Sequence, residues 1–255
     1  MRLRCSNRRA TETMKICLDA GHGVETAGKC SPDGTYFEHE FNLDVAKRSK
    51  AHLERCGLQV VMTREDEHDI SLAQRCKACN DAGCAYFISF HTNAGGKAGW
   101  YVAEDGIRWN TAEGLLINIV AVGGKAEELA WRIKRHAVRL LGCRDRGVQV
   151  ANWAVIRDTN CPAVLIEHGF HTSRTEVEKL KSDAYRAKCA EADARGICEQ
   201  VGVLWVPEAQ PQPQLPWYAE DRAWAMAQGI SDGTRPEEPA TRAEVWAMLR
   251  RAKEK

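Results

Sequence analysis

Short apolar runs alternate with longer amphipathic stretches along most of this chain, and the alternation indicates which element each segment forms. Runs rich in apolar, β-branched and aromatic residues predict buried strands. They occur at 15–19, 58–64, 85–94, 153–158 and 163–170. Because helical stretches separate most of these runs, the pattern predicts an α/β domain with a twisted, mostly parallel sheet flanked by helices.

Local signals predict where several of the helices begin and end. Asn42 is placed to cap a helix that stops at Gly57, whereas Ser71 and Gln74 have the spacing of a capping box. Ser173 and Glu176 have the same spacing. Apolar residues recur at helical spacing at 42–57, 71–83, 125–141 and 183–201.

Metal-competent side chains follow three of the predicted strands. His22 comes after the first run, His91 ends the central run, and Glu167 ends the run AVLIE. Ligands of such sheets bind beyond the carboxyl ends of the strands, so these groups are expected to converge. A single histidine after a strand is more often a structural residue, but three such groups and the flexible glycines beside His22 favour a site.

The residue types fit a hydrolytic zinc site. A catalytic zinc takes three protein ligands and leaves one position for water, and a further carboxylate is needed to move protons. His22, His91, Glu167 and one carboxylate of the pair Glu38 and Glu40 supply this set. The residues alone leave open which of Glu38 and Glu40 takes part.

Six separated segments then carry a family resemblance across residues 14–203. These are LDAGHG, EHEFNLDVA, VVMTR, SLAQRCKACNDAG, ISFHTNA and CPAVLIEHGF. In order and spacing they resemble the zinc-dependent N-acetylmuramoyl-L-alanine amidases of the amidase-3 type. The loop AGKCSPDGTYFEHEFN is most similar to phage and prophage endolysins of that family.

The resemblance implies one Zn²⁺ per chain, bound by His22, Glu38 and His91, with Glu167 as the catalytic glutamate. It thereby favours Glu38 over Glu40 and leaves His39 either exposed or behind the ligands. The segment 100–124 matches the family poorly, and we expect a strand and loop near the cleft there. No long helical insertion of the kind that plugs autoinhibited relatives is apparent, so an open site is expected.

Two further features receive plain structural interpretations. His168 stands where relatives usually carry an apolar residue; the polar alternatives are a contact to substrate or a place behind the ligands, but we favour a neutral substitution. Cys76 and Cys79 form a lone C-x-x-C among 11 scattered cysteines. Without a second such pair, they are interpreted as two small apolar residues on one helix face, not as a redox or structural zinc motif.

Composition narrows the range of partners. With 255 residues and a formal charge of +1, the chain has no electrostatic case for binding nucleic acid. No apolar run reaches the roughly 18 residues of a membrane span. The basic stretch 1–13 lacks the apolar core of a signal peptide. We expect it to be loosely ordered, and we expect synthesis in the cytoplasm followed by action at the cell wall.

A different region follows the predicted catalytic domain at 14–205. Residues 206–216 form a Pro/Gln-rich linker, and 217–255 contain two helical stretches, the second opened by Thr241 and Glu244 as a capping box. The segment from GISDGT to PATRAEV resembles a single S-layer homology motif. A single copy leaves three roles open: weak binding of a secondary cell-wall polymer, self-association, or an evolutionary remnant.

The expected function is hydrolysis of the amide between the lactyl group of N-acetylmuramic acid and L-alanine in peptidoglycan. A prophage endolysin is the favoured biological role, and a bacterial autolysin with the same chemistry is the alternative. Two other classes are a zinc peptidase that cuts stem peptides and a wall-binding protein without activity. The full set of His22, Glu38, His91 and Glu167 argues against the last of these.

Overall fold

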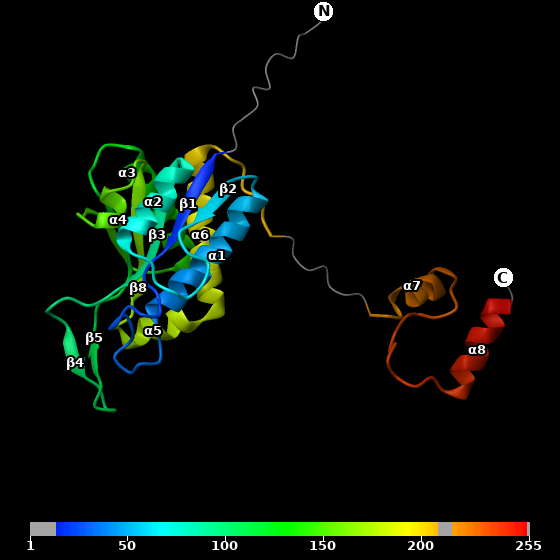
Figure 1. Cartoon of the computed structure of the whole chain (residues 1–255). Coiled ribbons are helices and arrows are strands. Elements are labelled where there is room, and N and C mark those ends of the chain that lie inside the picture. Colours follow the sequence, from blue (N-terminus) through cyan, green and yellow to red (C-terminus); the bar gives the residue numbers. More distant parts are fainter. Residues whose placement is uncertain (1–13, 209–215, 254–255) are drawn as a thin grey trace, which may run out of the picture. The chain divides into compact units, whose positions relative to one another are not determined.

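The computed structural model describes residues 14–208 and 216–253, which form two compact units, the first ending at Pro207 and the second beginning at Glu208. The first unit is built on a six-stranded sheet with the strand order β2-β1-β3-β8-β6-β7 (Figure 1). Its strands are β1 (Lys15–Ala20), β2 (Gln59–Met62), β3 (Tyr86–Asn93), β6 (Leu115–Ile119), β7 (Asp145–Val150) and β8 (Ala163–Phe170).

The direction of the strands confirms the mostly parallel sheet. Strands β2, β1, β3 and β8 are mutually parallel, whereas β6 runs antiparallel to β8 and parallel to β7. Neither β6 nor β7 is predicted by the apolar pattern. β6 lies inside the segment 100–124, and β7 is a polar edge strand whose sequence, DRGVQV, does not read as a buried run.

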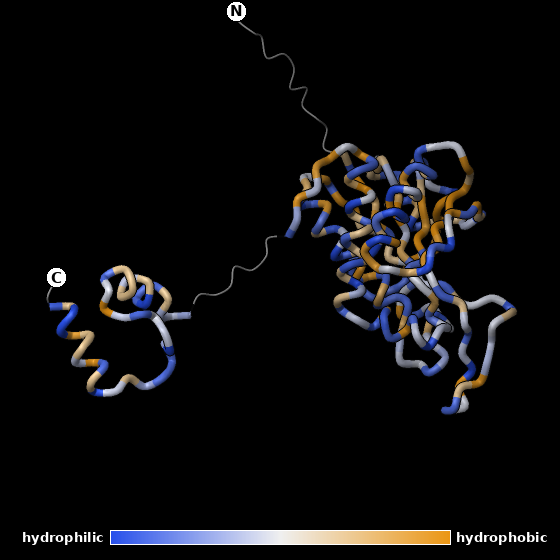
Figure 2. The backbone as a smooth tube through the Cα atoms, turned by 180° about the vertical axis from the view of Figure 1, so that it is seen from behind, coloured by the Kyte–Doolittle hydropathy of each residue, from blue (hydrophilic) through white to orange (hydrophobic). Residues whose placement is uncertain are grey.

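Helices cover both faces of the sheet. They are α1 (Glu38–Arg55), α2 (Leu72–Ala82), α3 (Lys125–Leu141), α4 (Ala154–Arg157), α5 (Arg174–Lys181) and α6 (Asp183–Val201). Helix α6 contacts both α1 and α3, and these three bury one face, while α2 and α4 contact each other and cover the other. Figure 2 shows hydrophobic residues gathered along the strands between these layers.

Alternation along the strands decides which side chain enters which layer. In β1, Ile16 and Leu18 belong to the larger core, whereas Cys17 belongs to the smaller core beneath α2 and α4. In β3, Ile88 and Phe87 divide in the same way. The period of two therefore places the side chains of His91 and Glu167 on the α2/α4 face, in step with Phe87 and Leu165.

Several helix limits match the sequence predictions. Ser71 accepts a hydrogen bond from the Gln74 amide, and Gln74 accepts one from the Ser71 amide, which confirms the capping box. Gly83 ends α2 with φ 64°, a left-handed conformation that favours glycine. The helices predicted at 125–141 and 183–201 are α3 and α6.

Two predicted caps are wrong because tertiary partners recruit the side chains. Helix α1 begins at Glu38, so Asn42 lies inside it and donates to the Gly21 carbonyl at 3.0 Å. Ser173 does precede α5, but its side chain makes no cap. The Glu176 carboxylate instead accepts hydrogen bonds from the Gly114 and Phe170 amides.

The run at 153–158, predicted as a strand, is helical. Residues 154–157 form the single turn α4, closed by hydrogen bonds from the Ile156 and Arg157 amides to the Trp153 carbonyl. Val155 and Ile156 are both buried against the α2 side of the sheet. A short apolar run fits either element, and here packing against α2 decides.

The segment 100–124 forms more than a strand and loop. A hairpin of β4 (Trp100–Val102) and β5 (Arg108–Asn110) extends away from the sheet, as Figure 1 shows, and β6 follows it. No residue of 100–124 is among those that line the cleft described below, but Leu116 of β6 pairs with Glu167, which does line it, so this segment lies near the cleft as expected.

The second unit holds α7 (Ala219–Ala227) and α8 (Arg242–Lys253). Thr241 and Glu244 exchange side-chain and backbone hydrogen bonds, so the capping box predicted there is present. Ile230 is its one buried hydrophobic residue among those described. Throughout the described parts of both units, no helix combines the length and the apolar character that crossing a bilayer requires.

Candidate active site

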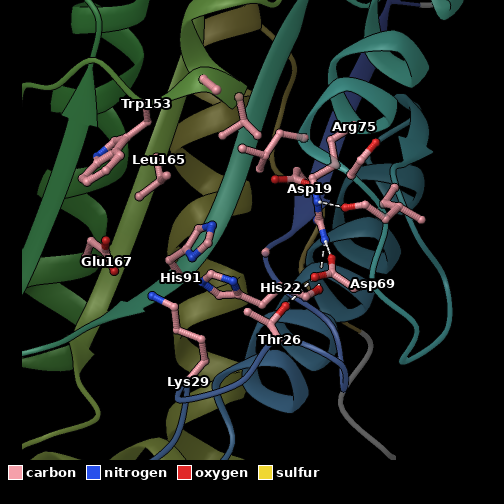
Figure 3. A pocket seen from close by; sticks show the side chains of 16 residues that line it. Asp19, His22, Thr26, Lys29, Asp69, Arg75, His91, Trp153, Leu165 and Glu167 are labelled. Atoms are coloured by element: carbon pink, nitrogen blue, oxygen red, sulfur yellow. Dashed lines mark hydrogen bonds and ion pairs between the residues drawn. The ribbon is translucent and has the colours of Figure 1, made fainter.

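Three of the predicted site residues converge although they come from separate elements. His22 follows β1, Glu38 is the first residue of α1, and His91 lies in β3. One ligand atom from each lies within 4.8 Å of those from the other two. Glu167 of β8 is paired with His91 in register, and Figure 3 shows both residues at the same cleft as His22.

Glu38 stands at the centre of this group. Its Oε1 accepts a hydrogen bond from the Thr92 amide at 3.1 Å and lies 2.9 Å from His91 Nδ1 and 3.5 Å from His22 Nε2. Its Oε2 is 3.6 Å from His171 Nδ1 and has no hydrogen-bond partner. Glu38 is thus buried among three imidazoles that contact one carboxylate.

These imidazoles determine the charge of Glu38. Burial opposes ionisation, but the hydrogen bond with His91 and the nearby charges of His91 and His22 lower the pKa of Glu38 to about 2. Burial lowers the pKa of His22 to about 4. At neutral pH the group therefore presents a carboxylate and a neutral imidazole, the forms that bind metals.

Glu167 is the same residue type in a different environment. It is half-buried, its Oε2 is shielded from solvent without a hydrogen-bond partner, and no cation forms an ion pair with it among the described residues. Burial raises the pKa of Glu167 to about 7, with repulsion from Glu38 adding to the effect. A carboxylate with a pKa near neutrality suits proton transfer in both directions.

The two glycines around His22 have separate steric reasons. A Cβ on Gly21 would lie 2.2 Å from ring atoms of His91, and one on Gly23 would lie 2.3 Å from the Asp69 amide nitrogen. His22 itself has φ 58°, a left-handed conformation that is uncommon for a residue with a Cβ. The Gly-His-Gly sequence thus allows a strained turn that directs His22 toward Glu38.

Buried arginines hold this turn in place. Arg75 of α2 donates to the carbonyls of Ala20 and His22 and forms ion pairs with Asp19 and Asp69, drawn as dashed lines in Figure 3. The sequence does not predict this role, because a helical arginine at this spacing would ordinarily be solvent-exposed.

Arg64, after β2, supports the same turn from another side. It donates to the carbonyls of Ala20, Gly21 and His39. The side chain of His39 is buried, so the alternative that it is exposed is wrong. Its backbone carbonyl, held by Arg64, connects the start of α1 to the turn that carries His22.

His168 belongs to the opposite face of the sheet. Because it follows Glu167 directly, its side chain enters the larger core, where Nε2 lies 2.8 Å from Asp193 Oδ2 of α6. Both side chains are fully buried. His168 is therefore half of a buried polar pair, neither a substrate contact nor the neutral substitution that we favoured.

His22, His91 and Glu167 line a cleft of about 400 Å³, while Glu38 is buried in contact with His91. The cleft is also lined by side chains that the sequence predictions missed. Lys29 and the half-exposed Trp153 stand at its walls in Figure 3. The sequence analysis did not select Trp153 as a site residue, because the run that contains it was interpreted as a buried strand. Lys29 lies in an irregular loop, where a single lysine is ordinarily a solvated surface residue.

The donor set fits a zinc ion. Two imidazoles and one carboxylate are a common set of ligands for catalytic zinc, and all three donor atoms already lie close together. The Glu38 Oε2 atom is a buried acceptor without a partner, which a cation beside the carboxylate would stabilise. The residues present therefore fit the metal that the family resemblance implies.

Comparisons with known proteins agree with this geometry. The N-acetylmuramoyl-L-alanine amidase CwlM of Bacillus licheniformis is 33% identical over 184 residues, which cover 72% of this chain and 67% of CwlM. The endolysin of Bacillus phage SPP1 is 29% identical over 187 residues, covering 72% of this chain and 65% of the endolysin.

A solved structure and a family model extend the agreement. The N-acetylmuramoyl-L-alanine amidase of Clostridium difficile 630 superimposes with a TM-score of 0.68 at 29% identity, covering 74% of this chain and 97% of that one. The family model described as Amidase_3, N-acetylmuramoyl-L-alanine amidase, matches residues 16–199. On its fold, its site and these matches, the chain belongs to the Amidase_3 family of N-acetylmuramoyl-L-alanine amidases.

Proposed function

We propose that this protein is a zinc-dependent peptidoglycan hydrolase that cleaves the amide between the lactyl group of N-acetylmuramic acid and L-alanine. The observation that carries the proposal is the convergence of His22, Glu38 and His91 on one point, with Glu167 in the same cleft as the two histidines, in a member of the amidase family. His22, Glu38 and His91 would hold the metal, and Glu167 would move the proton.

Each ligand is fixed before the metal arrives. The Thr92 amide orients Glu38, the turn held by Arg75 and Arg64 orients His22, and the sheet fixes His91. Zinc bound there would polarise the scissile carbonyl and lower the pKa of a water molecule in the cleft. Preorganised ligands reduce the rearrangement needed during the reaction.

Glu167 then supplies the acid–base chemistry. Its ionised carboxylate accepts a proton from the attacking water, and the protonated carboxyl passes that proton to the alanine nitrogen as the amide bond breaks. A pKa of about 7 lets both protonation states occur at neutral pH. The walls of the cleft give the substrate an indole surface at Trp153 and a cation at Lys29. These suit a sugar ring and the carboxylates of a stem peptide, respectively.

The biological setting that we favour is lysis of a host wall by a prophage endolysin, with a bacterial autolysin as the alternative. Similarity to the endolysin of Bacillus phage SPP1 supports the first, and similarity to CwlM is equally consistent with the second. We further propose that the second unit is an S-layer-homology-like module. Its exposed Trp217, Trp224 and Trp246 are available for a wall polymer or for self-association.

The test combines metal analysis with digestion of purified peptidoglycan. The purified protein should contain zinc, should lose hydrolysis on chelation, and should regain it when zinc is added. The products should be intact stem peptides and glycan strands without peptides. Fragments of stem peptides would instead identify a zinc peptidase, and binding to walls without hydrolysis would identify a wall-binding protein.

A further inference from the structure

A second group of possible metal ligands lies outside the catalytic cleft. The Sγ atoms of Cys17, Cys79 and Cys84 lie within 4.8 Å of one another, and Cys161 Sγ is 3.6 Å from that of Cys79. We propose that these four cysteines bind a second zinc ion in a structural Cys₄ site. The inference stands apart from the proposed amidase function, because none of these residues belongs to the catalytic group.

The sulfur spacing approaches that of a tetrahedral site. With a Zn–S bond of about 2.3 Å, the ligand sulfurs of a zinc tetrahedron are about 3.8 Å apart. The measured 3.6 Å between Cys79 and Cys161 is close to that edge, and Cys17, Cys79 and Cys84 lie within 4.8 Å of one another. Cys161 lies outside that mutual group, so closing the tetrahedron requires it to move toward Cys17 and Cys84. With that movement the four thiols would form a complete set of ligands with no fifth group required.

The four sulfurs come from four separate segments. Cys17 lies in β1, Cys79 in α2, Cys84 in the connection to β3, and Cys161 in the loop before β8. The interpretation of Cys76 and Cys79 as small apolar residues rested on the lack of a second C-x-x-C. That interpretation still applies to Cys76, whose Sγ contacts the carbonyls of Ala154 and Val155. It does not apply to Cys79, because the fold brings three other thiols close to its Sγ.

The surroundings suit a closed structural ion. Cys17, Cys79 and Cys84 are buried in the smaller core, next to Phe87 and other apolar residues, so no water competes as a ligand. Cys161 is partly exposed, which gives an ion a way in. The ammonium of Lys15, bound to the Ala82 carbonyl, is a positive charge close to the group and would offset part of the negative charge of four thiolates.

Such a site would stabilise the segments that position the catalytic residues. In the sequence, Cys17 comes shortly before His22 and Cys161 comes shortly before Glu167. These residues lie on the same face of the sheet. An ion bound by thiolates from β1, α2 and the loop before β8 would crosslink the segments that carry the catalytic residues. Because zinc binds only the folded arrangement, it would stabilise the fold.

The test measures metal content in the full-length protein and in matched variants. Wild-type protein should hold two zinc ions per chain, and X-ray absorption should show both sulfur and nitrogen/oxygen ligands. Cys161→Ser and Cys79→Ser should each reduce the content to one ion. Cys76→Ser is the matched control, since it changes a buried cysteine on the same helix face and should leave two ions.

A second measurement separates this site from the catalytic one. His91→Ala should also hold one zinc ion, but its remaining ion should have only sulfur ligands, whereas the ion in Cys161→Ser should have none. Cobalt-loaded wild-type protein should show intense sulfur-to-cobalt charge-transfer absorption that Cys161→Ser lacks. This readout does not depend on hydrolytic activity, and it applies to wild-type protein if a variant fails to fold.

Two results would overturn the inference. One is wild-type protein whose zinc has no sulfur ligand and whose four thiols are all alkylated after unfolding. The other is a disulfide between Cys79 and Cys161 in the purified protein, detected by mass spectrometry. Conversely, sulfur-bound zinc in a protein that cannot hydrolyse peptidoglycan would refute the proposed function and leave this inference intact.

Discussion

At the scale of single residues, two glutamates of the site have pKa values shifted in opposite directions. Glu38 contacts imidazoles and a backbone amide, so its pKa falls to about 2 even though it is buried. Glu167 has no such partner, and burial raises its pKa to about 7. Environment thus assigns one carboxylate to metal binding and the other to proton transfer.

The Glu167→Gln substitution tests this division of roles. It keeps the shape of the side chain but removes the ability to exchange a proton, so hydrolysis should fall by roughly 10²–10⁴-fold while zinc stays bound. Zinc content and hydrolysis of a soluble muropeptide measure the two effects. His91→Ala should lose both catalytic zinc and activity. Loss of the catalytic zinc from Glu167→Gln would show that Glu167 is itself a ligand.

Gly21→Ala tests the steric reason for the Gly-His-Gly sequence. The added Cβ would meet the ring of His91 at 2.2 Å, so His91 must move and zinc at that site should be lost. Gly96→Ala is the control, because a Cβ there meets no atom within 4 Å. Zinc content and hydrolysis should be unchanged in the control. Full activity in Gly21→Ala would contradict the packing described.

Zinc affinity at the catalytic site should rise with pH. Burial opposes the charge on His91, but Glu38 raises its pKa above the usual value, so the metal-free protein retains this proton at higher pH than a free histidine would. Glu167 also holds a proton up to a pH of about 7. Zinc must displace the proton on His91 and favours loss of the one on Glu167.

Competition with a chromophoric chelator at a series of pH values on both sides of the Glu167 pKa of about 7 measures this dependence. The affinity should increase across that range and then level off once both groups are deprotonated. Glu167→Gln should show a shallower increase, because one of the two protons is absent. An affinity that is independent of pH would contradict these assignments.

At the scale of elements, α2 and β1 are joined through a buried charge pair. Arg75 contacts Asp19 at 2.7 Å with both side chains buried, and Asp19 also accepts hydrogen bonds from Ser89 and Thr63. Burial favours the neutral form of Asp19, but Arg75 and these hydroxyls lower its pKa. The carboxylate is therefore charged in the folded protein and depends on Arg75 for compensation.

Arg75→Met should lower the free energy of unfolding by about 3–5 kcal/mol, the usual cost of leaving a buried charge without its partner. Urea unfolding of the zinc-free protein measures the change. The double variant Arg75→Met with Asp19→Asn should recover part of it, since no charge then remains buried. Arg135→Met is the surface control, where loss of the exposed pair with Glu199 should change the free energy of unfolding far less.

At the scale of the whole molecule, the catalytic groups all lie in the unit that ends at Pro207. Contacts continue slightly beyond the predicted limit at 205. Arg55 donates to the Val206 carbonyl, the Val206 amide contacts Cys56 Sγ, and Trp205 packs against Arg195 and His52. The chain should therefore be cut after Pro207 when the first unit is studied alone.

A protein truncated after Pro207 should fold, bind zinc and hydrolyse soluble muropeptides at nearly the full rate. If the second unit targets the wall, truncation should reduce activity on whole walls by lowering the local enzyme concentration. If it mediates assembly, light scattering should show a smaller mass instead. A folded, zinc-loaded truncation that cannot hydrolyse the soluble substrate would show that the second unit completes the active site.

Local patterns in the sequence predicted correctly the elements that depend on interactions between near neighbours in the chain. The Ser71 capping box, the helices at 125–141 and 183–201, and the apolar strands β1, β3 and β8 formed as predicted, because caps and hydrophobic periodicity act within a few residues. Of the four site residues, the residues alone indicated His22, His91 and Glu167. The choice of Glu38 required the resemblance to a family.

Tertiary structure decided everything that depended on partners distant in the sequence. It drew Asn42 and Glu176 away from caps, turned 153–158 into a helix, and placed His168 on the face opposite Glu167. It also brought Cys79 together with thiols from three other segments. A side chain's partners depend on which faces of helices and strands pack together. Because those faces come from segments far apart in this chain, local sequence patterns do not predict the contacts between them.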